Sequence, residues 1–430
     1  MIKLPKEVNN IVKVLEKGGH QAYTVGSCVR DSIMGVAPLD WDVVTIAKPE
    51  EMKEALKAEM EKASQRSKTI GDDLLRLDYT EEKFDEEGES LGFEGIVVDV
   101  LAIDGTIEEY LSIQDFTINA MADNPDKPFL DPYEGREDIK KKLIKTIEDA
   151  DKSFKEEPIR MMRAVRFAAE LDFDLHKSVY EATVANCNLL FDGHLEEIRE
   201  EFERIVVASH AGKGLNMMAD SGLMAAVVGE EVFRKMNSRE RKTFTELCEG
   251  IDKTKQVRTR RLGLLYTCFD KKKGLAAIDR LVYDAETLQH LTDAMCELLN
   301  IQFLFDPKAF KNFLVKVGMD RYNYLHNLAK AQRIVYDQPA TKIESRNHYM
   351  REIINNNEPV FPEDLIIDAN DIMEAGITDD PAKAENLLVM LTDVVHLDVR
   401  NNVRDYLLKK ARQFNRSKFA ASTRGVKWLK

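Results

Sequence analysis

The first 125 residues mix two hydrophobic periods, one typical of helices and one typical of strands. Apolar residues recur at helical spacing in three places, which predicts helices at 7–18, 29–34 and 50–64. Short apolar runs rich in β-branched residues predict strands at 22–25, 41–46 and 95–101. The acidic, glycine-containing stretch before the last of these strands is expected to be a loop. The beginning of the chain is therefore predicted to be an α+β head.

After Pro132 the pattern becomes helical almost throughout, and prolines separate the helical stretches. The segment 339–362, which contains three prolines and a run of asparagines, is expected to separate a last helical module from the rest. The fold class expected from the pattern is α+β, with a mixed-sheet head followed by an all-α remainder.

Composition supports a folded globular protein. The chain has 430 residues, of which 44% are hydrophobic and 32% charged, so a disordered or collagen-like chain is excluded. No run approaches the roughly 20 apolar residues that cross a bilayer, and the start lacks a signal-peptide core. We therefore expect no membrane partner. The five cysteines are scattered without a C-x-x-C pair, which indicates reduced thiols in a cytoplasmic protein rather than a zinc site.

Charge is distributed unevenly along the chain. The 62 basic and 76 acidic residues give a net charge of −14, which excludes a uniformly basic nucleic-acid wrapper. Residues 401–430 nevertheless hold nine Lys or Arg against one acid, and 253–273 is a second basic stretch. A polyanion would be attracted to these basic parts in a salt-dependent way. The acidic stretch 72–94 is read as a solvated face.

A strand-to-helix turn carries the first candidate chemistry. Gly26 and Ser27 follow the strand 22–25 and open a helix, so free backbone N–H groups and the positive helix end face the turn. A phosphate would lie there, and Arg30 would add a bidentate contact. Taken alone, a glycine-containing turn of this kind is a weak signal.

Three aspartates form the second candidate group. Period-two alternation places Asp40 and Asp42 on one face of a strand. Paired carboxylates repel each other unless a cation lies between them, and Mg²⁺ with a phosphate substrate is the usual solution. Asp99, in the middle of another strand, would complete a three-carboxylate site for two metal ions. A lone D-x-D is more often surface charge, so the combination carries the prediction.

The order of these motifs resembles the signature of class II tRNA nucleotidyltransferases and bacterial poly(A) polymerases. The match begins with Gly-Ser-x-Val-Arg-Asp at 26–31, followed by D-x-D at 40–42. The chain also resembles further family elements, in order, at 115–120 (Asp-Phe-Thr-Ile-Asn-Ala), 131–139, 156–167, 214–224 and 364–408. The likeness covers nearly the whole chain.

The resemblance implies a fold, an activity and partners. The fold would be a nucleotidyltransferase head at 1–125, a helical neck for base selection at 126–200, a helical body at 201–355 and a tRNA-binding tail at 356–430. The activity would be addition or repair of the 3′-terminal CCA of tRNA from CTP and ATP, with Mg²⁺ held by Asp40 and Asp42 and with Asp99 as a catalytic residue. Nucleotide-binding residues implied by the motifs are Gly26, Ser27, Arg30, Gln114, Asp115, Asn119, Glu157, Arg160, Arg163 and Arg166.

The element at 156–167 also has a physical interpretation of its own. Pro158 suits the first turn of a helix, and arginines follow at 160, 163 and 166 along one side of it. Cytosine and adenine both present an amino donor beside a ring-nitrogen acceptor. A carboxylate at Glu157 and a guanidinium at Arg160 would therefore accept C and A and reject U and G. Arg163 and Arg166 would reach the triphosphate. The alternative is an ordinary surface helix with links such as Glu156–Arg160.

Departures from the family pattern leave other activities open. Ser27 stands where the family has a second glycine, Ile113 and Gln114 stand where it has two arginines, and Glu157 replaces an aspartate. These differences bear on nucleotide preference. The alternatives are a poly(A) polymerase, an enzyme that adds only CC or only A, and a non-catalytic RNA-binding homologue. The sequence leaves the oligomeric state open.

Overall fold

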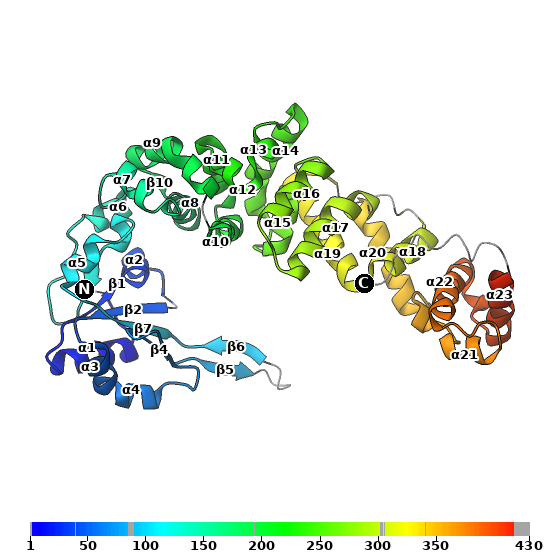
Figure 1. Cartoon of the computed structure of the whole chain (residues 1–430), viewed down its shortest axis with the longest axis horizontal. Helices are drawn as coiled ribbons and strands as arrows, with labels where there is room; N and C mark the ends of the chain where they lie inside the picture. Colours follow the sequence, from blue (N-terminus) through cyan, green and yellow to red (C-terminus); the bar gives the residue numbers. More distant parts are fainter. Residues whose placement is uncertain are drawn as a thin grey trace. The chain divides into compact units, whose positions relative to one another are not determined.

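The computed structural model describes residues 2–38, 40–84, 90–192, 194–301, 304, 306–339 and 341–416. The chain forms two compact units, Met1–Val227 and Val228–Lys430, each described by itself below (Figure 1). All five cysteines are free thiols, as predicted. Among the described residues no helix has both the length and the apolar character needed to cross a bilayer.

A six-stranded mixed sheet forms the base of the first unit. Its spatial order is β3-β4-β7-β2-β1-β8. The strands are β1 (Ala22–Val25), β2 (Asp40–Thr45), β3 (Lys68–Ile70), β4 (Leu74–Asp78), β7 (Val97–Ala102) and β8 (Ala122–Asp123). β2 and β7 pair in parallel, and the other neighbours in this sheet are antiparallel. The three predicted strands are thus confirmed, and they lie side by side at its centre.

The central strands divide their side chains between two faces. On one face Trp41 and Val43 are at most 2% exposed, and Val98 and Val100 of β7 are fully buried. The alternate positions carry Asp40, which is exposed, and the half-buried Asp42 and Asp99. Further along this polar face Val44 packs in a small apolar cluster with residues of β1 and α5. Period-two alternation therefore separates a core face from a polar face.

Helices pack on the sheet and enclose its core. Those of the head are α1 (Lys6–Lys17), α2 (Ser27–Met34), α3 (Pro49–Ala55), α4 (Lys57–Lys62) and α5 (Ile107–Ser112). α1 contacts β1, β2 and α3, while α2 contacts β1 and β2. The predicted helices at 7–18 and 29–34 are confirmed to within two residues, and the predicted helix at 50–64 is two short ones.

The acidic stretch 72–94 is not the loop that its composition suggested. Its described residues form β4 and a two-stranded antiparallel ribbon, β5 (Glu81–Phe84) and β6 (Ser90–Glu94), which extends from the sheet in Figure 1. Leu75 and Leu77 are fully buried at alternate positions of β4. The period-two pattern was missed because acidic residues have low β-propensity, although they are tolerated on the solvent side of a strand. Residues 85–89 lie outside the described part.

The remainder of the first unit is helical apart from a short parallel pair, β9 (Leu143–Ile144) with β10 (Asp174–Leu175). The helices are α6 (Gly135–Lys141), α7 (Ala150–Glu156), α8 (Arg160–Leu171), α9 (Lys177–Asn186), α10 (Leu195–Val207), α11 (Ala211–Ser221) and α12 (Leu223–Val228), with 3₁₀ turns η1 (Thr117–Asn119) and η2 (Cys187–Asp192). α8 packs against both α10 and α11. Its buried side is apolar and includes Met161, Met162 and Val165.

The second unit is all-α in its described residues. Its helices are α13 (Glu230–Phe233), α14 (Ser238–Gly250), α15 (Arg258–Tyr266), α16 (Lys271–Arg280), α17 (Ala285–Ile301), α18 (Pro307–Val317), α19 (Met319–Val335), α20 (Thr341–Asn355), α21 (Ala369–Glu374), α22 (Pro381–Leu397) and α23 (Arg404–Arg416), with 3₁₀ turns η3 (Ile251–Lys253), η4 (Pro362–Asp364) and η5 (Val399–Asn401). α21, α22 and α23 share a core that includes Ile372, Leu391 and Leu407. The predicted change to helical structure after Pro132 is confirmed.

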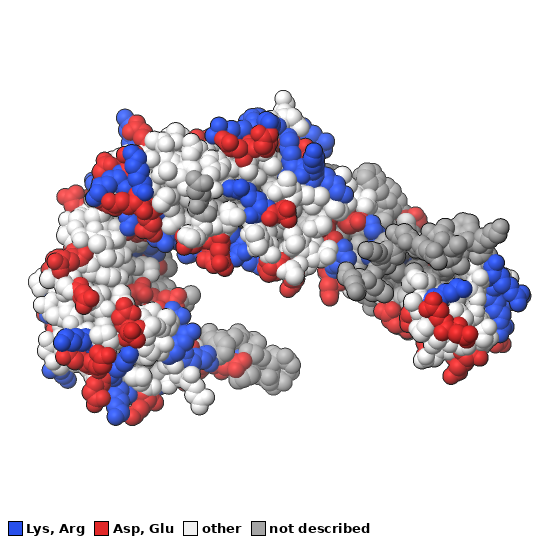
Figure 2. All heavy atoms as spheres, viewed as in Figure 1, with Lys and Arg blue, Asp and Glu red and all other residues white. Residues whose placement is uncertain are grey.

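The basic stretch 253–273 is only partly a surface feature. Arg261 is 1% exposed and donates to the carbonyl and hydroxyl oxygens of Thr254. Lys273 pairs with the buried Glu240 at 2.7 Å. On the face drawn in Figure 2, Lys and Arg are interspersed with Asp and Glu, as the nearly balanced totals of 62 and 76 suggest. Fewer cations of this stretch face solvent than the sequence implied.

The four-part division at 125, 200 and 355 stays a prediction. The two compact units meet in the sequence at Val227 and Val228, so the first unit contains the predicted head and neck with the beginning of the predicted body.

Candidate active site

A glycine turn connects β1 to α2 and leaves the helix end accessible. Gly26 occupies the N-cap position with φ +72°, a backbone conformation that suits glycine. A Cβ at this position would lie 3.7 Å from Oδ2 of Asp42, so the turn and the carboxylate are neighbours. The beginning of α2 therefore lies beside the acidic residues, and Ser27 lines the same hollow as Asp42.

The pairing of β2 with β7 brings the three predicted aspartates to one hollow. In the parallel register Asp42 lies directly opposite Asp99. Ser27, Asp40, Asp42 and Asp99 all line a hollow of about 500 Å³. Burial, reinforced by the charges of Asp99 and Asp40, raises the pKa of Asp42 to about 6, while Arg76 opposes the shift. The carboxylates thus create a negative potential that a cation would relieve.

Arg76 holds the third carboxylate. From β4 its Nε and Nη2 donate to the two oxygens of Asp99, at 2.7 and 2.6 Å. Among the described residues no three acidic, histidine or cysteine side chains converge as a ready metal site. The donor set nevertheless suits a hard divalent cation, because three carboxylates line one hollow. Asp40 and Asp42 are the residues that would hold it.

Arg30 does not line the acidic hollow but is buried in a polar chain. It is 5% exposed, and its guanidinium donates to Oδ1 of Asn119 at 2.9 Å and pairs with Asp31 at 2.8 Å. Asn119 in turn donates to Asp115 at 3.0 Å. Gln114 donates to the backbone carbonyl of Tyr110. The structure thus connects Arg30, Asn119 and Asp115, which the sequence predicted separately.

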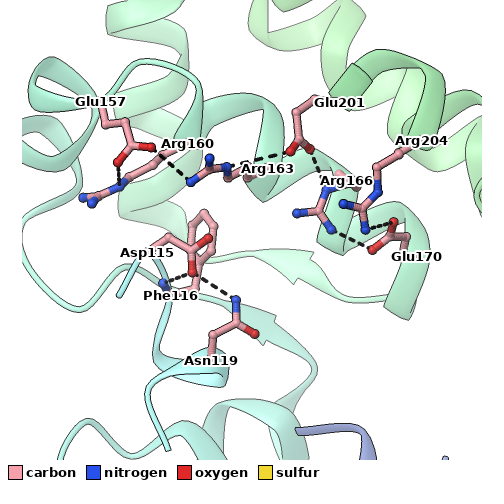
Figure 3. Close-up of polar contacts among 10 residues, drawn as sticks. All are labelled: Asp115, Phe116, Asn119, Glu157, Arg160, Arg163, Arg166, Glu170, Glu201 and Arg204. Atoms are coloured by element: carbon pink, nitrogen blue, oxygen red, sulfur yellow. Dashed lines mark hydrogen bonds and ion pairs between the residues drawn. The ribbon is translucent and has the colours of Figure 1, made fainter. Parts of the chain in front are cut away.

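Glu157 and Arg160, which were predicted to read the base, form an ion pair in the first unit (Figure 3). Oε2 of Glu157 lies 2.9 Å from Nε of Arg160, and Oε1 accepts from Nη1 of Arg163 at 3.0 Å. Arg160 also donates to the hydroxyl of Ser153 at 2.9 Å. α8 begins at Arg160, so Pro158 lies in the turn before the helix. The surface link between Glu156 and Arg160 is replaced by the pair with Glu157.

Acids from two helices continue this pairing along α8. Glu201 of α10 accepts from Nε of Arg166 at 2.5 Å and lies 3.8 Å from Nε of Arg163 (Figure 3). Arg166 also donates to Glu170, which pairs with Arg204. The buried Arg166 therefore has two acidic partners, and a contact with the triphosphate would compete with both of them.

An aromatic ring joins the two halves of the candidate site. The guanidinium of Arg166 lies 4.0 Å from the ring centre of Phe167, and that of Arg30 lies 5.2 Å from the same centre. Phe116 meets Phe167 edge to face. The contact of Arg30 with Phe167 connects helix α2 to helix α8, whereas Arg166 and Phe167 both belong to α8.

Sequence reasoning missed several members of the site. Lys68, Arg66, Arg76 and Asp78 line the acidic hollow, and Glu201 orders the neck arginines. A signal for Arg76 existed, since it lies between Leu75 and Leu77 in a period-two pattern. Nothing in the sequence indicates the partner of Glu201, because its contacts span more than thirty residues.

Comparison with known proteins adds a family to this geometry. Residues 22–145 match the family model of the poly A polymerase head domain. This match contains the glycine turn, the three aspartates and Asn119. Residues 22–145 therefore resemble a poly A polymerase head domain, and the rest of the chain lies outside this match.

Curated relatives of the chain carry names that describe two different activities. The CCA-adding enzyme of Geobacillus stearothermophilus is 31% identical over 224 residues, which are 52% of this chain and 55% of that protein. The CC-adding tRNA nucleotidyltransferase of Halalkalibacterium halodurans is 33% identical over 220 residues, 51% of this chain and 53% of that protein. The chain thus spans about half the length of the curated relatives it matches.

Solved structures share the fold at low identity. A Bacillus stearothermophilus CCA-adding enzyme in complex with CTP superposes with a TM-score of 0.71 at 22% identity, covering 95% of this chain and 98% of that one. A Thermotoga maritima CCA-adding enzyme complexed with tRNA gives a TM-score of 0.61 at 20% identity, with 95% of both chains covered. The predicted α+β nucleotidyltransferase fold is confirmed.

Proposed function

We propose that this chain is a template-independent nucleotidyltransferase that builds or repairs the 3′-terminal CCA of tRNA from CTP and ATP, and that it works in the cytoplasm. The observation that carries the proposal is the meeting of three carboxylates with a glycine turn and a helix N-terminus in one hollow. The names of the curated relatives support the choice of tRNA as the RNA substrate.

Asp40 and Asp42 would hold Mg²⁺ ions. Bound there, Mg²⁺ neutralises charge on the triphosphate and on the oxygens that attack and leave. Asp42 is suited to this role because it is half-buried and lies opposite Asp99 in the strand pair. Asp99 orients the 3′-hydroxyl of the RNA and favours loss of its proton.

The glycine turn binds the triphosphate. N–H groups at the beginning of α2 and the hydroxyl of Ser27 donate to phosphate oxygens, and the positive helix end adds a favourable potential. Arg30 stabilises the beginning of α2 through its ion pair with Asp31 and its hydrogen bond to Asn119. The RNA hydroxyl attacks the α-phosphorus in line, the bond to the bridging oxygen breaks, and pyrophosphate leaves.

Glu157 and Arg160 select the base. Glu157 accepts a hydrogen from the exocyclic amino group of cytosine or adenine, and Arg160 donates to the adjacent ring nitrogen. Uracil and guanine reverse donor and acceptor at these positions, so neither base would form both of these hydrogen bonds. Arg163 orients the carboxylate through its 3.0 Å bond to Oε1 of Glu157.

Substitution of Asp42 tests the proposal. We expect Asp42→Asn to lower incorporation of CMP into a tRNA lacking its CCA end by about three orders of magnitude, because several kcal/mol of transition-state charge stabilisation are lost. The affinity for tRNA should change little. Asp104→Asn, an exposed aspartate of the same head, is the matched control. Incorporation by the Asp42 variant at the wild-type rate would contradict the metal assignment.

The added sequence distinguishes the candidate activities. The similarity to a CC-adding enzyme favours a second candidate, an enzyme that adds CC alone. Incubation of tRNA lacking its CCA end with Mg²⁺ and each labelled nucleotide, followed by sequencing of the products, separates CCA, CC-only, A-only and poly(A) addition. The absence of any incorporation would favour a non-catalytic RNA-binding homologue, the reading suggested by Ile113 and Gln114.

A further inference from the structure

Four charged side chains lie in one row across the polar face of the sheet. Lys68 of β3 is opposite Arg76 of β4, Arg76 is opposite Asp99 of β7, and Asp99 is opposite Asp42 of β2. Residues that face each other across neighbouring strands point to the same side. The row therefore begins with two cations at the sheet edge and ends with two carboxylates, beside the glycine turn after β1. All four side chains line the acidic hollow.

The two cations of this row retain donors for a ligand. The Arg76 side chain is 41% exposed, and its bond pair with Asp99 uses two of the five N–H donors that a guanidinium carries. Lys68 is exposed and has no acidic partner among the described residues. Arg66, a third cation of the hollow, is engaged by Asp78 and Thr80. The hollow thus presents positive charge on the side away from the glycine turn.

In-line transfer assigns an occupant to that side. The attacking and leaving oxygens lie on opposite sides of the α-phosphorus. If the leaving pyrophosphate lies at Gly26 and Ser27, the attacking 3′-hydroxyl must approach from the side of Asp99 and β4. We propose that Lys68 and Arg76 bind the backbone phosphate of the 3′-terminal nucleotide of the RNA. This inference rests on the proposed function and adds an RNA subsite to it.

Chemistry and dimensions agree with a phosphodiester at this position. Neighbouring strands are about 4.8 Å apart, so Lys68 is roughly 10 Å from the Asp99 position, a span that one nucleotide can bridge. The terminal ribose carries both the reacting 3′-oxygen and the 5′-phosphate, so the phosphate must lie close to the acids. The row then does two things: Arg76 positions Asp99, and Arg76 with Lys68 places the RNA end against it.

Lys68→Gln tests the subsite without disturbing the acids. Binding of tRNA lacking its CCA end is measured by fluorescence anisotropy in EDTA over a series of salt concentrations. We expect a roughly fivefold weaker affinity and a salt slope smaller by about one, because one phosphate contact is lost. The KM for CTP should not change. Lys57→Gln, an exposed lysine of α4 outside the hollow, is the matched control and should bind as wild type.

A neutral linkage in the RNA locates the contact. Replacement of the last internucleotide phosphate by methylphosphonate should weaken binding to the wild type and have little further effect on Lys68→Gln. If the methylphosphonate weakened RNA binding equally in the wild type and in Lys68→Gln, the proposal would be overturned. It would also be overturned if Lys68→Gln raised the KM for CTP and left RNA binding unchanged, because the cations would then lie beside the pyrophosphate. Since the binding assay needs no catalysis, failure of incorporation in the wild type would refute the proposed function separately.

Discussion

Glu157 illustrates how one carboxylate is prepared for recognition. Arg160 and Arg163 each engage one of its oxygens, and Glu201 in turn lies beside Arg163. Each carboxylate oxygen has a second lone pair, so the acid can still accept a hydrogen from a base. Because these contacts restrict the rotamers before a nucleotide arrives, little side-chain entropy remains to be lost on binding.

Loss of Arg160 should relax base selection. In Arg160→Ala the donor to the ring nitrogen disappears while Glu157 keeps its contact with Arg163. We expect discrimination of CTP over UTP, measured as the ratio of kcat/KM values, to fall by about tenfold to a hundredfold. Lys155→Ala, an exposed residue of α7 paired with Asp151, is the control. An unchanged ratio would exclude Arg160 from base reading.

At the residue scale, the sequence predicted which residues belong to the candidate site better than it predicted the contacts of each residue. Asp40 and Asp42 share a face as expected because alternation along a strand is a local property, and Asp99 joins them through the pairing of β2 with β7. The environment of Arg30 was not predictable, since its acceptor Asn119 is 89 residues away in the chain. The same holds for Glu201 and Arg166, whose pairing depends on how α8 and α10 pack.

At the scale of elements, two of the recognised motifs lock together. The hydroxyl of Thr117 donates to Asp138 at 2.7 Å, which joins the turn η1 to α6. Asp131 accepts from the backbone N–H groups of Gly135 and Arg136 and so fixes the beginning of that helix. These motif residues therefore stabilise the turn that contains Asn119, and they do not line the acidic hollow.

Gly135→Ala should destabilise this joint. A Cβ at Gly135 would overlap the carbonyl oxygen of Thr117, a backbone atom that cannot move without shifting η1. We expect a loss of about 1–3 kcal/mol in the free energy of unfolding, measured by denaturant titration. Glu137→Ala, exposed on the same helix, is the comparison and should stay within about 0.5 kcal/mol of wild type. Equal stabilities would show that the turn can relax.

Element prediction succeeded where one period dominated. The strands at 22–25, 41–46 and 95–101 combine β-branched residues with clear boundaries, and the sheet confirms each of them. Prediction failed at β4, where Arg76 lies between the buried Leu75 and Leu77, Asp78 follows them, and the surrounding acids suggested a loop. Because β4 carries a cation and an acid of the candidate site on its polar side, its composition is hydrophilic and does not indicate a strand.

The whole molecule combines an acidic total with a basic end. Residues 417–430 hold four Lys or Arg and no acid, and they lie outside the described part of the chain, beyond α23. Net charge of −14 repels RNA at long range, so local basic segments must supply the attraction. The tRNA-binding role of the predicted tail rests on this charge.

Neutralising that end should weaken tRNA binding. With Lys418, Arg424, Lys427 and Lys430 changed to Gln, we expect a higher KM for tRNA and a salt slope smaller by up to about three. A chain ending at Arg416 should behave in the same way. The KM for CTP serves as the internal control, since nucleotide binding is assigned to the first unit. A tRNA KM and slope equal to those of wild type would leave this segment without a role in binding.

The alternation within β2, β4 and β7 has a consequence for changing the protein. Around the hollow, alternate positions of each strand serve separate purposes, since Trp41, Leu75 and Val98 maintain the hydrophobic interior while Asp42, Arg76 and Asp99 present charge. The charged positions around the hollow could therefore be substituted without changing the buried residues between them. The same arrangement makes insertion of a single residue into any of these strands costly, because it would exchange the two sets of side chains and bury the charges.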